Sequence, residues 1–204
     1  MLNFFTRQGR NRNKAARQLY RAIMETSRNP AFYEDYKIPD TLEGRYEILA
    51  LHAGLLVNRL SAPDMGIYGR KLAQKFFDVM FRDVEWSLRE SGVGDLAVPR
   101  RVKKMMSSFK GRAIAYDEAV KSGKSEVIHA LTRNIYGVAK VQQMYEVEKL
   151  AEYTQACVRK LATQGLSDFS QGFISLPDVP SLELGNQVNP QPLQGDTDEY
   201  REAA

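Results

Sequence analysis

Apolar residues recur at intervals of three and four positions along most of this chain, and no segment alternates strictly between apolar and polar residues. The first pattern is typical of amphipathic helices and the second of β-strands. The expected helices are residues 13–28, 40–60, a long segment from after Pro63 to Ser91, a segment beginning at Pro99, and residues 124–138 and 141–164. The predicted fold class is therefore all-α, a single compact bundle of about six or seven helices with an irregular C-terminal tail.

The pattern also divides the chain into three parts. Residues 1–12 form a basic N-terminal arm, residues 13–164 form the helical domain, and residues 165–204 form an acidic tail that contains prolines and glycines. We expect this tail to be largely disordered. Four apolar residues near its start can still pack over the body: Phe169, Phe173, Ile174 and Leu176.

Residues 40–60 show the clearest helical pattern in the chain. Asp40 can cap the first turn, and Glu43, three residues later, can close a capping box. Apolar residues then form two separate stripes along the helix. A helix that is apolar on two sides is expected at the centre of the bundle.

Arg45, His52 and Arg59 recur at seven-residue spacing between these two stripes. A buried charge must be paired, and Asp83, which falls among apolar positions of the next long helix, is the expected partner of both arginines. We interpret the four residues as a structural charge seam. The alternative is an anion or haem-propionate contact with His52 as a haem ligand, and a haem titration with and without His52→Ala separates the two.

Residues 76–116 join the densest aromatic segment of the chain to its most basic one. Trp86 lies near the end of the aromatic helix, and we expect it in the core, with an exposed contact for a partner as the alternative. Residues 92–99 contain no phosphate-binding glycine motif. We interpret them as a helix stop and a short turn before the next helix.

The basic helix combines an apolar face with positive charge, and no acidic residue occurs between Asp95 and Asp117. Met105, Met106 and Phe109 lie on its apolar face, where the two methionines form a deformable surface suited to varied apolar partners. We expect the basic edge of this helix to face outward and to bind a partner. The residues of this edge are Arg100, Arg101, Lys103, Lys104 and Arg112.

The net charge of +4 conceals an uneven distribution. From Gly165 onward the chain has seven acidic residues and one arginine, so the preceding residues carry a net charge of +10. A basic body of this kind favours anionic partners such as RNA, the ribosome or an anionic membrane surface. No apolar run reaches the roughly 20 residues that span a bilayer, and we expect neither a secretory signal nor a transit peptide.

The sequence offers little for catalysis or metal binding. Cys157 is the only cysteine, which excludes an internal disulfide and a multi-cysteine metal site. The two histidines, His52 and His129, lie far apart in the sequence, and no nucleophile–base motif accompanies them. We therefore expect no enzymatic activity, no catalytic or metal-binding residue and no cofactor.

Three segments of the chain form a recognisable set. They are DTLEGRYEILALHAGLLVNRL at residues 40–60, FFDVMFRDVEWSLRESGVGDLAVPRRVKKM at residues 76–105 and FKGRAIAY at residues 109–116. Because they occur in order at the expected spacing, the chain resembles the ubiquinol-cytochrome c chaperone family over roughly residues 15–160. Lys110 departs from the pattern of that family, in which an aromatic residue is expected before Gly111-Arg112.

The resemblance implies a helical, non-enzymatic factor that binds newly made cytochrome b and promotes assembly of respiratory complex III. It also implies a bacterial member, working in the cytoplasm and peripherally associated with the inner membrane. The ribosome exit region and anionic lipid are further expected partners, and DNA is not. The alternative is a basic helical module that binds RNA, the ribosome or an anionic membrane surface without a cytochrome client. The oligomeric state and the need for a small partner protein stay open.

Overall fold

The computed structural model describes residues 2–137 and 144–182 and contains no strand over these residues. Its long helices are α1 (Leu2–Ser27), α3 (Leu42–Ser61), α4 (Gly66–Glu90), α5 (Val98–Ser122) and α8 (Met144–Ala162). The shorter elements are α2 (Ala31–Glu34), a 3-10 turn (Pro63–Met65), α6 (Lys124–Leu131), a π-helical turn (Thr132–Tyr136) and α9 (Leu166–Gln171). The predicted all-α bundle is confirmed.

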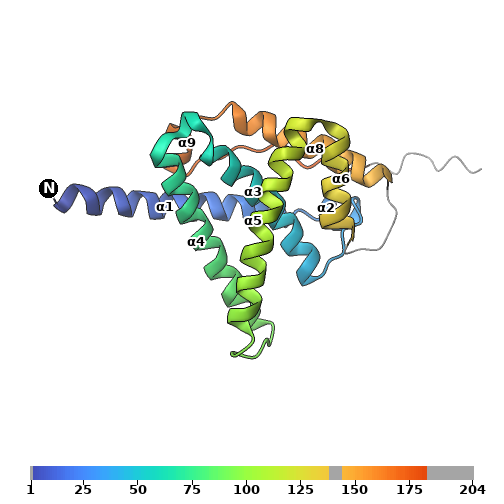
Figure 1. The fold of residues 1–204 in the computed structure, drawn as a ribbon, viewed down its shortest axis with the longest axis horizontal. Coiled ribbons are helices and arrows are strands. Elements are labelled where there is room, and N and C mark those ends of the chain that lie inside the picture. The colour runs from blue at the N-terminus through green and yellow to red at the C-terminus, as the bar shows by residue number, and fades with distance from the viewer. Residues whose placement is uncertain (1, 138–143, 183–204) are drawn as a thin grey trace, which may run out of the picture.

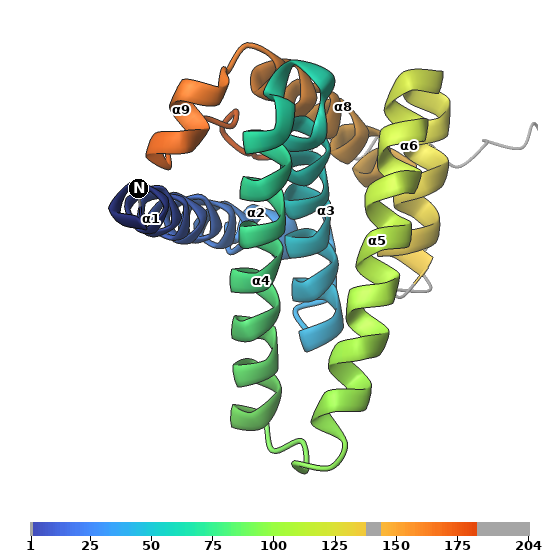
Figure 2. The same cartoon turned by 60° about the vertical axis from the view of Figure 1, so that its left-hand side comes forward.

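The helices α4 and α5 form a long antiparallel hairpin, and its tip extends beyond the other helices (Figures 1 and 2). α1 crosses α4 (Figure 1), and α6 runs beside the upper part of α5 (Figure 2). α8 and α9 lie at the end of the molecule opposite the tip (Figure 1). α3 occupies the middle and contacts α1, α4, α5 and α8.

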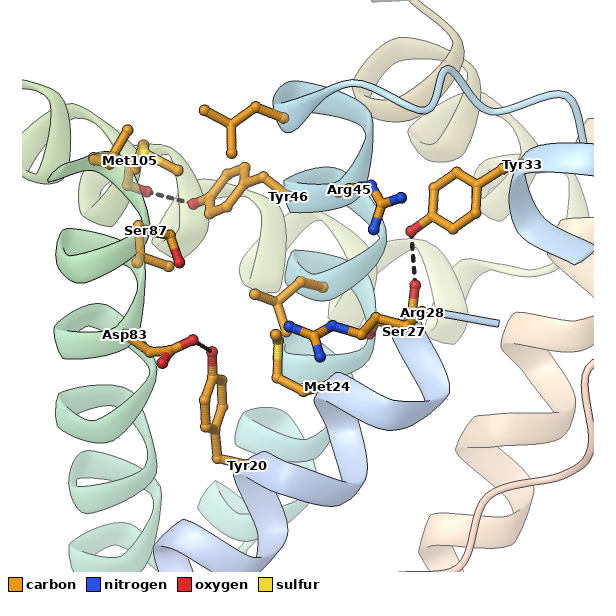
Figure 3. A pocket seen from close by; sticks show the side chains of 14 residues that line it. Tyr20, Met24, Ser27, Arg28, Tyr33, Arg45, Tyr46, Asp83, Ser87 and Met105 are labelled. Atoms are coloured by element: carbon orange, nitrogen blue, oxygen red, sulfur yellow. Dashed lines mark hydrogen bonds between the residues drawn. The ribbon is translucent and has the colours of Figure 1, made fainter. Parts of the chain in front are cut away.

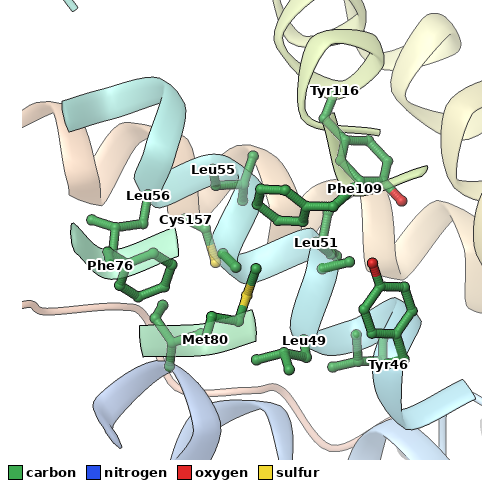
Figure 4. Close-up of a cluster of buried hydrophobic side chains, with 14 of the residues drawn as sticks. Tyr46, Leu49, Leu51, Leu55, Leu56, Phe76, Met80, Phe109, Tyr116 and Cys157 are labelled. Carbon is green, nitrogen blue, oxygen red and sulfur yellow. The ribbon is translucent and has the colours of Figure 1, made fainter. Parts of the chain in front are cut away.

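The central position of α3 follows from its two apolar stripes. Of its 20 residues, 13 are buried, so it needs cover on every side. Leu51, Leu55 and Leu56 meet side chains from three other helices in one cluster (Figure 4). Labelled residues of this cluster from the other helices are Phe76, Met80, Phe109, Tyr116 and Cys157.

Small residues set the contact between α3 and α5. A β-carbon added to Gly54 would lie 3.4 Å from the Cα of Ala113, so the two helices approach closely at this point. Asn58, one turn further along α3, donates a hydrogen bond of 2.8 Å to the carbonyl of Ala113. Because interiors are close-packed, this contact determines how α5, and with it the hairpin, lies against α3.

A buried ion pair joins the same two helices. Arg112 donates two hydrogen bonds of 2.5 Å to the carboxylate of Glu47, whose side chain is only 5% exposed. Burial raises the pKa of Glu47, and Arg112 opposes this effect. The prediction that Arg112 faces outward with the basic edge was therefore wrong, because this part of α5 turns its arginine toward α3.

The charge seam predicted along α3 is also corrected. Arg45 binds Asp40 and is exposed, while Arg59 binds Asp64 through two hydrogen bonds and reaches carbonyl groups at the end of α8. Neither arginine pairs with Asp83. Asp40 lies five positions before Arg45, and Asp64 lies five positions after Arg59. Each arginine therefore binds a carboxylate close to it in the sequence instead of Asp83 on α4.

His52, the third residue of that row, is fully buried. Its Nδ1 lies 2.9 Å from the carbonyl oxygen of Ile48, which can only accept, so Nδ1 carries the proton. Its Nε2 accepts a hydrogen bond of 2.9 Å from the hydroxyl of Tyr153. Burial lowers the pKa of His52 to about 4. With the lone pair of Nε2 occupied, the geometry favours a structural role for His52 over the haem-ligand alternative.

Two boundaries differ from the sequence predictions, and a third cannot be compared. α1 begins at Leu2, so the predicted basic arm continues the first helix. Thr41, not Asp40, caps α3 by accepting a hydrogen bond from the backbone of Gly44, because the Asp40 carboxylate is engaged with an arginine. The predicted helix ends at 138–143 lie outside the described residues.

The first part of the predicted disordered tail is ordered. α9 packs on α1 and buries Phe169 completely. Gln164 binds both the backbone N–H and the carbonyl of Ser175, and the backbone N–H of Leu182 donates to Asp35. Residues 165–182 therefore cover the body as a strap. The rest of the expected disorder falls on residues 183–204, outside the described part of the chain.

Glu47→Gln should lower the free energy of unfolding by about 3 kcal/mol, because it leaves Arg112 without its counter-charge in a mostly buried position. Asp117→Asn is the matched control, since it breaks an exposed pair with Lys121 and should cost less than about 0.5 kcal/mol. Denaturant unfolding measures both. Equal effects of the two substitutions would contradict the assigned role of the buried pair.

Acidification should destabilise the protein through His52. Between the ordinary histidine pKa of 6.5 and the folded value of about 4, the unfolded chain binds a proton that the folded chain does not. The stabilisation is therefore complete above pH 6.5 and is lost as the pH falls, by about 2 kcal/mol between pH 7 and pH 5.

The test compares the pH dependence of unfolding in the parent chain with that in two variants. His52→Gln should remove this component, whereas His129→Gln, which changes an exposed histidine, should retain it. An unchanged pH dependence in His52→Gln would show that His52 is not the group responsible.

Candidate functional site

An open cavity of about 160 Å³ lies between α1, α3, α4 and the start of α5 (Figure 3). α1, α3 and α4 each present residues spaced three or four apart, which places them on one face toward the cavity, and α5 contributes Met105. Apolar side chains form most of its wall: Met24, Leu42, Leu49, Val84, Leu88 and Met105. The cavity lies next to the hairpin, close to the part of it that extends from the bundle (Figures 2 and 3).

Polar groups inside the cavity are mostly bonded to the protein itself. Tyr20 donates a hydrogen bond of 2.6 Å to Asp83, and burial, with Asp83 adding to it, raises the pKa of the Tyr20 hydroxyl. Tyr46 donates 2.8 Å to the carbonyl of Met105, and burial raises the pKa of Tyr46 to about 12. Tyr33 donates 2.7 Å to a backbone carbonyl of α1. Because these three hydroxyls are already bonded to the protein, the surface that remains for a ligand is largely apolar.

Cations lie around the rim of this cavity. Arg28, directly after α1, is exposed beside it, and Arg45 of α3 lies over the ring of Tyr33 with its charge shared by Asp40. The guanidinium of Arg45 also lowers the pKa of Asp40 through their hydrogen bond. An apolar interior with a cationic rim suits an apolar chain segment whose neighbours are polar or negatively charged.

The described residues provide no evident machinery for a reaction. They contain no group of three or more histidine, cysteine or acidic side chains placed to hold a metal ion. Cys157 is buried, and burial raises the pKa of its thiol to about 12, which disfavours the reactive thiolate. Met24 and Met105 in the cavity wall can adapt to the shape of an apolar ligand.

The structure separates the apolar residues that were expected to contact a partner. Met105 lines the cavity, and Met106 is half-buried against the core. Phe109 is buried in an aromatic cluster with Phe77 and Phe81, so it belongs to the core and does not contact a partner directly. Helical periodicity places all three residues on one face of α5. It does not show which of them α4 covers.

Trp86 is 62% exposed, so its expected place in the core was wrong. The four remaining cations of the basic edge are all exposed in the first turns of α5: Arg100, Arg101, Lys103 and Lys104.

Sequence reasoning missed Met24 and Leu42 as cavity residues. Leu42 remains 41% exposed at the rim although it belongs to an apolar stripe of α3. Met24 sits on the apolar face of α1 and resembles Met105 in its chemistry, which was the available signal. Which helix faces would meet at the cavity could not be derived from either residue alone.

None of the helices in the described ranges has both the length and the apolar character needed to cross a bilayer.

Known proteins resemble this chain in sequence and in structure. "Protein CBP3, mitochondrial" of Saccharomyces cerevisiae is 30% identical over 144 residues, which cover 69% of this chain and 42% of the yeast protein. "Ubiquinol-cytochrome c reductase complex assembly factor 1" of Drosophila melanogaster is 27% identical over 169 residues, which cover 81% of this chain and 63% of the fly protein. The chain thus spans about half the length of these two relatives.

A crystal structure of the Cbp3 homolog from Brucella abortus superimposes on this fold with a TM-score of 0.77 at 34% sequence identity. The superposition covers 87% of this chain and 97% of the Brucella chain. Residues 34–175, well over half of the sequence, match the family described as ubiquinol-cytochrome C chaperone. The chain therefore belongs to the ubiquinol-cytochrome c chaperone family.

Proposed function

We propose that this chain is a non-enzymatic chaperone that binds newly made cytochrome b and promotes assembly of respiratory complex III. Its family supports this role, as does a fly relative named as an assembly factor of ubiquinol-cytochrome c reductase. The observation that carries the proposal is the open cavity with apolar walls between α1, α3, α4 and α5. A client that is itself a membrane protein offers the apolar helices that such a cavity can hold.

The cavity is too small for a helix but large enough for apolar side chains. We therefore expect a client segment to lie across the opening and to insert side chains past Leu42 toward Met24 and Met105. Methionine side chains adjust to different shapes, so the site can accept successive client segments without strong preference. A small buried contact also keeps affinity modest, which permits release once later subunits arrive.

We further propose that the chaperone works in the cytoplasm, peripherally at the inner membrane and near the ribosome exit region, where such a client is inserted. The exposed cations at the start of α5 support contact with an anionic surface.

A second candidate function, binding of RNA or the ribosome without a cytochrome client, is favoured by a separate observation. α1 carries a row of exposed cations along a shallow hollow: Arg10, Lys14, Arg17 and Arg21. Such a row suits a phosphate backbone.

Deletion of the gene should separate the two functions. If the chain serves cytochrome b, the deletion strain should lose cytochrome b absorbance and assembled complex III while keeping other respiratory complexes, and the full chain should restore both. Difference spectra and native gels measure this. Intact complex III in the deletion strain, with altered association of RNA, would support the second function and contradict the first.

Leu42→Glu should weaken client association by about tenfold, because a carboxylate at the rim must be desolvated when an apolar side chain enters. Met105→Glu should have the same effect from inside the cavity. Met144→Glu is the matched control, since this methionine is exposed on α8, away from the cavity.

The readout is the amount of cytochrome b that co-purifies with each variant, after denaturant unfolding has shown that the variant is folded. Leu42→Glu keeps this test valid if Met105→Glu is destabilised, because Leu42 is partly exposed. Normal co-purification with folded Leu42→Glu would remove the cavity from the proposed function.

A further inference from the structure

The tip of the α4–α5 hairpin exposes apolar side chains that the cavity does not use. Leu96, in the turn between the two helices, is 99% exposed, and Trp86 near the end of α4 is largely exposed as well. The tip also projects beyond the other helices (Figures 1 and 2), so it can reach a flat surface before the body does. Two large apolar side chains at a projecting turn are costly in water and indicate that something covers them.

The same end of the hairpin carries positive charge. Arg100, Arg101, Lys103 and Lys104 are exposed in the first two turns of α5, and none of them forms an ion pair with a described residue. Arg89 binds both Glu85 and Asp95 and offsets one of their two negative charges, and Glu90 is exposed without an ion pair among the described residues. Residues 85–104 therefore keep a net charge of +2. The tip therefore combines the exposed apolar side chains of Leu96 and Trp86 with a collar of exposed cations. The collar consists of Arg100, Arg101, Lys103 and Lys104.

The distances along the hairpin match the interface of a bilayer. At the helical rise, Arg100 and Arg101 lie about 3–5 Å, Trp86 about 6 Å and Lys104 about 9 Å behind the turn. Apolar groups of interfacial proteins penetrate about 5–10 Å into the boundary between headgroups and acyl chains, where tryptophan is also favoured. Arginine and lysine side chains at this depth extend toward lipid phosphates.

α1 is the other basic surface. Its exposed cations run along one side of the helix from Arg10 to Arg21. Two exposed apolar side chains lie near it, Ile67 at the start of α4 and Phe173 in the segment after α9. The substitutions Arg17→Gln and Arg21→Gln therefore decide between this surface and the tip.

We infer that the tip of the α4–α5 hairpin is a membrane-docking element that inserts Leu96 and Trp86 into the interface of an anionic phospholipid bilayer, with the collar of Arg100, Arg101, Lys103 and Lys104 on the lipid phosphates. The inference rests on the proposed peripheral location at the inner membrane and names the residues that provide it. It also places the opening of the cavity near the bilayer, because Ser87, Leu88 and Met105 line the cavity on the same hairpin.

Purified full-length protein and phospholipid vesicles test this inference without any client. The protein should float with vesicles of mixed phosphatidylcholine and phosphatidylglycerol and much less with pure phosphatidylcholine. Trp86 is the only tryptophan, so its fluorescence reports on the tip itself and should shift to shorter wavelength on binding. Added salt should weaken the association, because the charges involved are exposed.

Three variants locate the contact. Arg100→Gln with Arg101→Gln should weaken binding about thirtyfold, since each cation near an anionic leaflet contributes about fivefold. Leu96→Ser should weaken it about fivefold through lost apolar insertion. Arg159→Gln with Lys160→Gln removes equal charge from the exposed end of α8 and should leave binding within about twofold.

The inference is overturned if the protein does not bind mixed vesicles or if bound protein shows no change in Trp86 fluorescence. It is also overturned if the α8 variant loses as much binding as the tip variants, or if Arg17→Gln with Arg21→Gln abolishes binding while the tip variants retain it. Because the assay contains no cytochrome b, such a failure leaves the chaperone function standing. A deletion strain with normal complex III would conversely leave vesicle binding intact.

Discussion

The burial of α3 is the constraint on which the rest of the structure depends. A helix with apolar residues on both sides and most of its length buried must be surrounded, and α1, α4, α5 and α8 supply that cover. Two contacts set how α5 lies on α3: the close approach of Gly54 to Ala113 and the ion pair of Glu47 with Arg112. Both contacts fix α5, and with it the hairpin, against α3. The packing of the core therefore determines where the exposed side chains of the hairpin lie.

The cavity and the hairpin tip are places where this cover is incomplete. α1 crosses the hairpin and leaves an opening beside Met105, while α4 and α5 extend past the end of the bundle (Figures 2 and 3). Leu42 beside the cavity and Trp86 and Leu96 on the hairpin are exposed in these places, while Ile67, Met144, Tyr145 and Phe173 are exposed on other parts of the body. This arrangement suits a protein that must hold an apolar client next to a membrane while its own body stays folded.

Periodicity predicted much of this fold, because each long helix carries a strong apolar stripe. It failed where the outcome depends on which neighbour covers a face. Trp86 and Phe109 both lie in amphipathic helices, yet one is exposed and the other buried, and only the packing of α4 on α5 decides between them. Arg45 and Arg59 likewise found carboxylates five residues away instead of Asp83, since local partners need no long-range arrangement.

The central claim is that cytochrome b occupies the cavity, and site-specific photocrosslinking during its synthesis tests this most directly. A photoreactive side chain at Leu42, on the rim, should form an adduct with newly made cytochrome b. The same group at Ile67, exposed at the far end of α4, should form none. Adducts from Ile67 as strong as those from Leu42, or no adduct with cytochrome b from Leu42, would contradict the account.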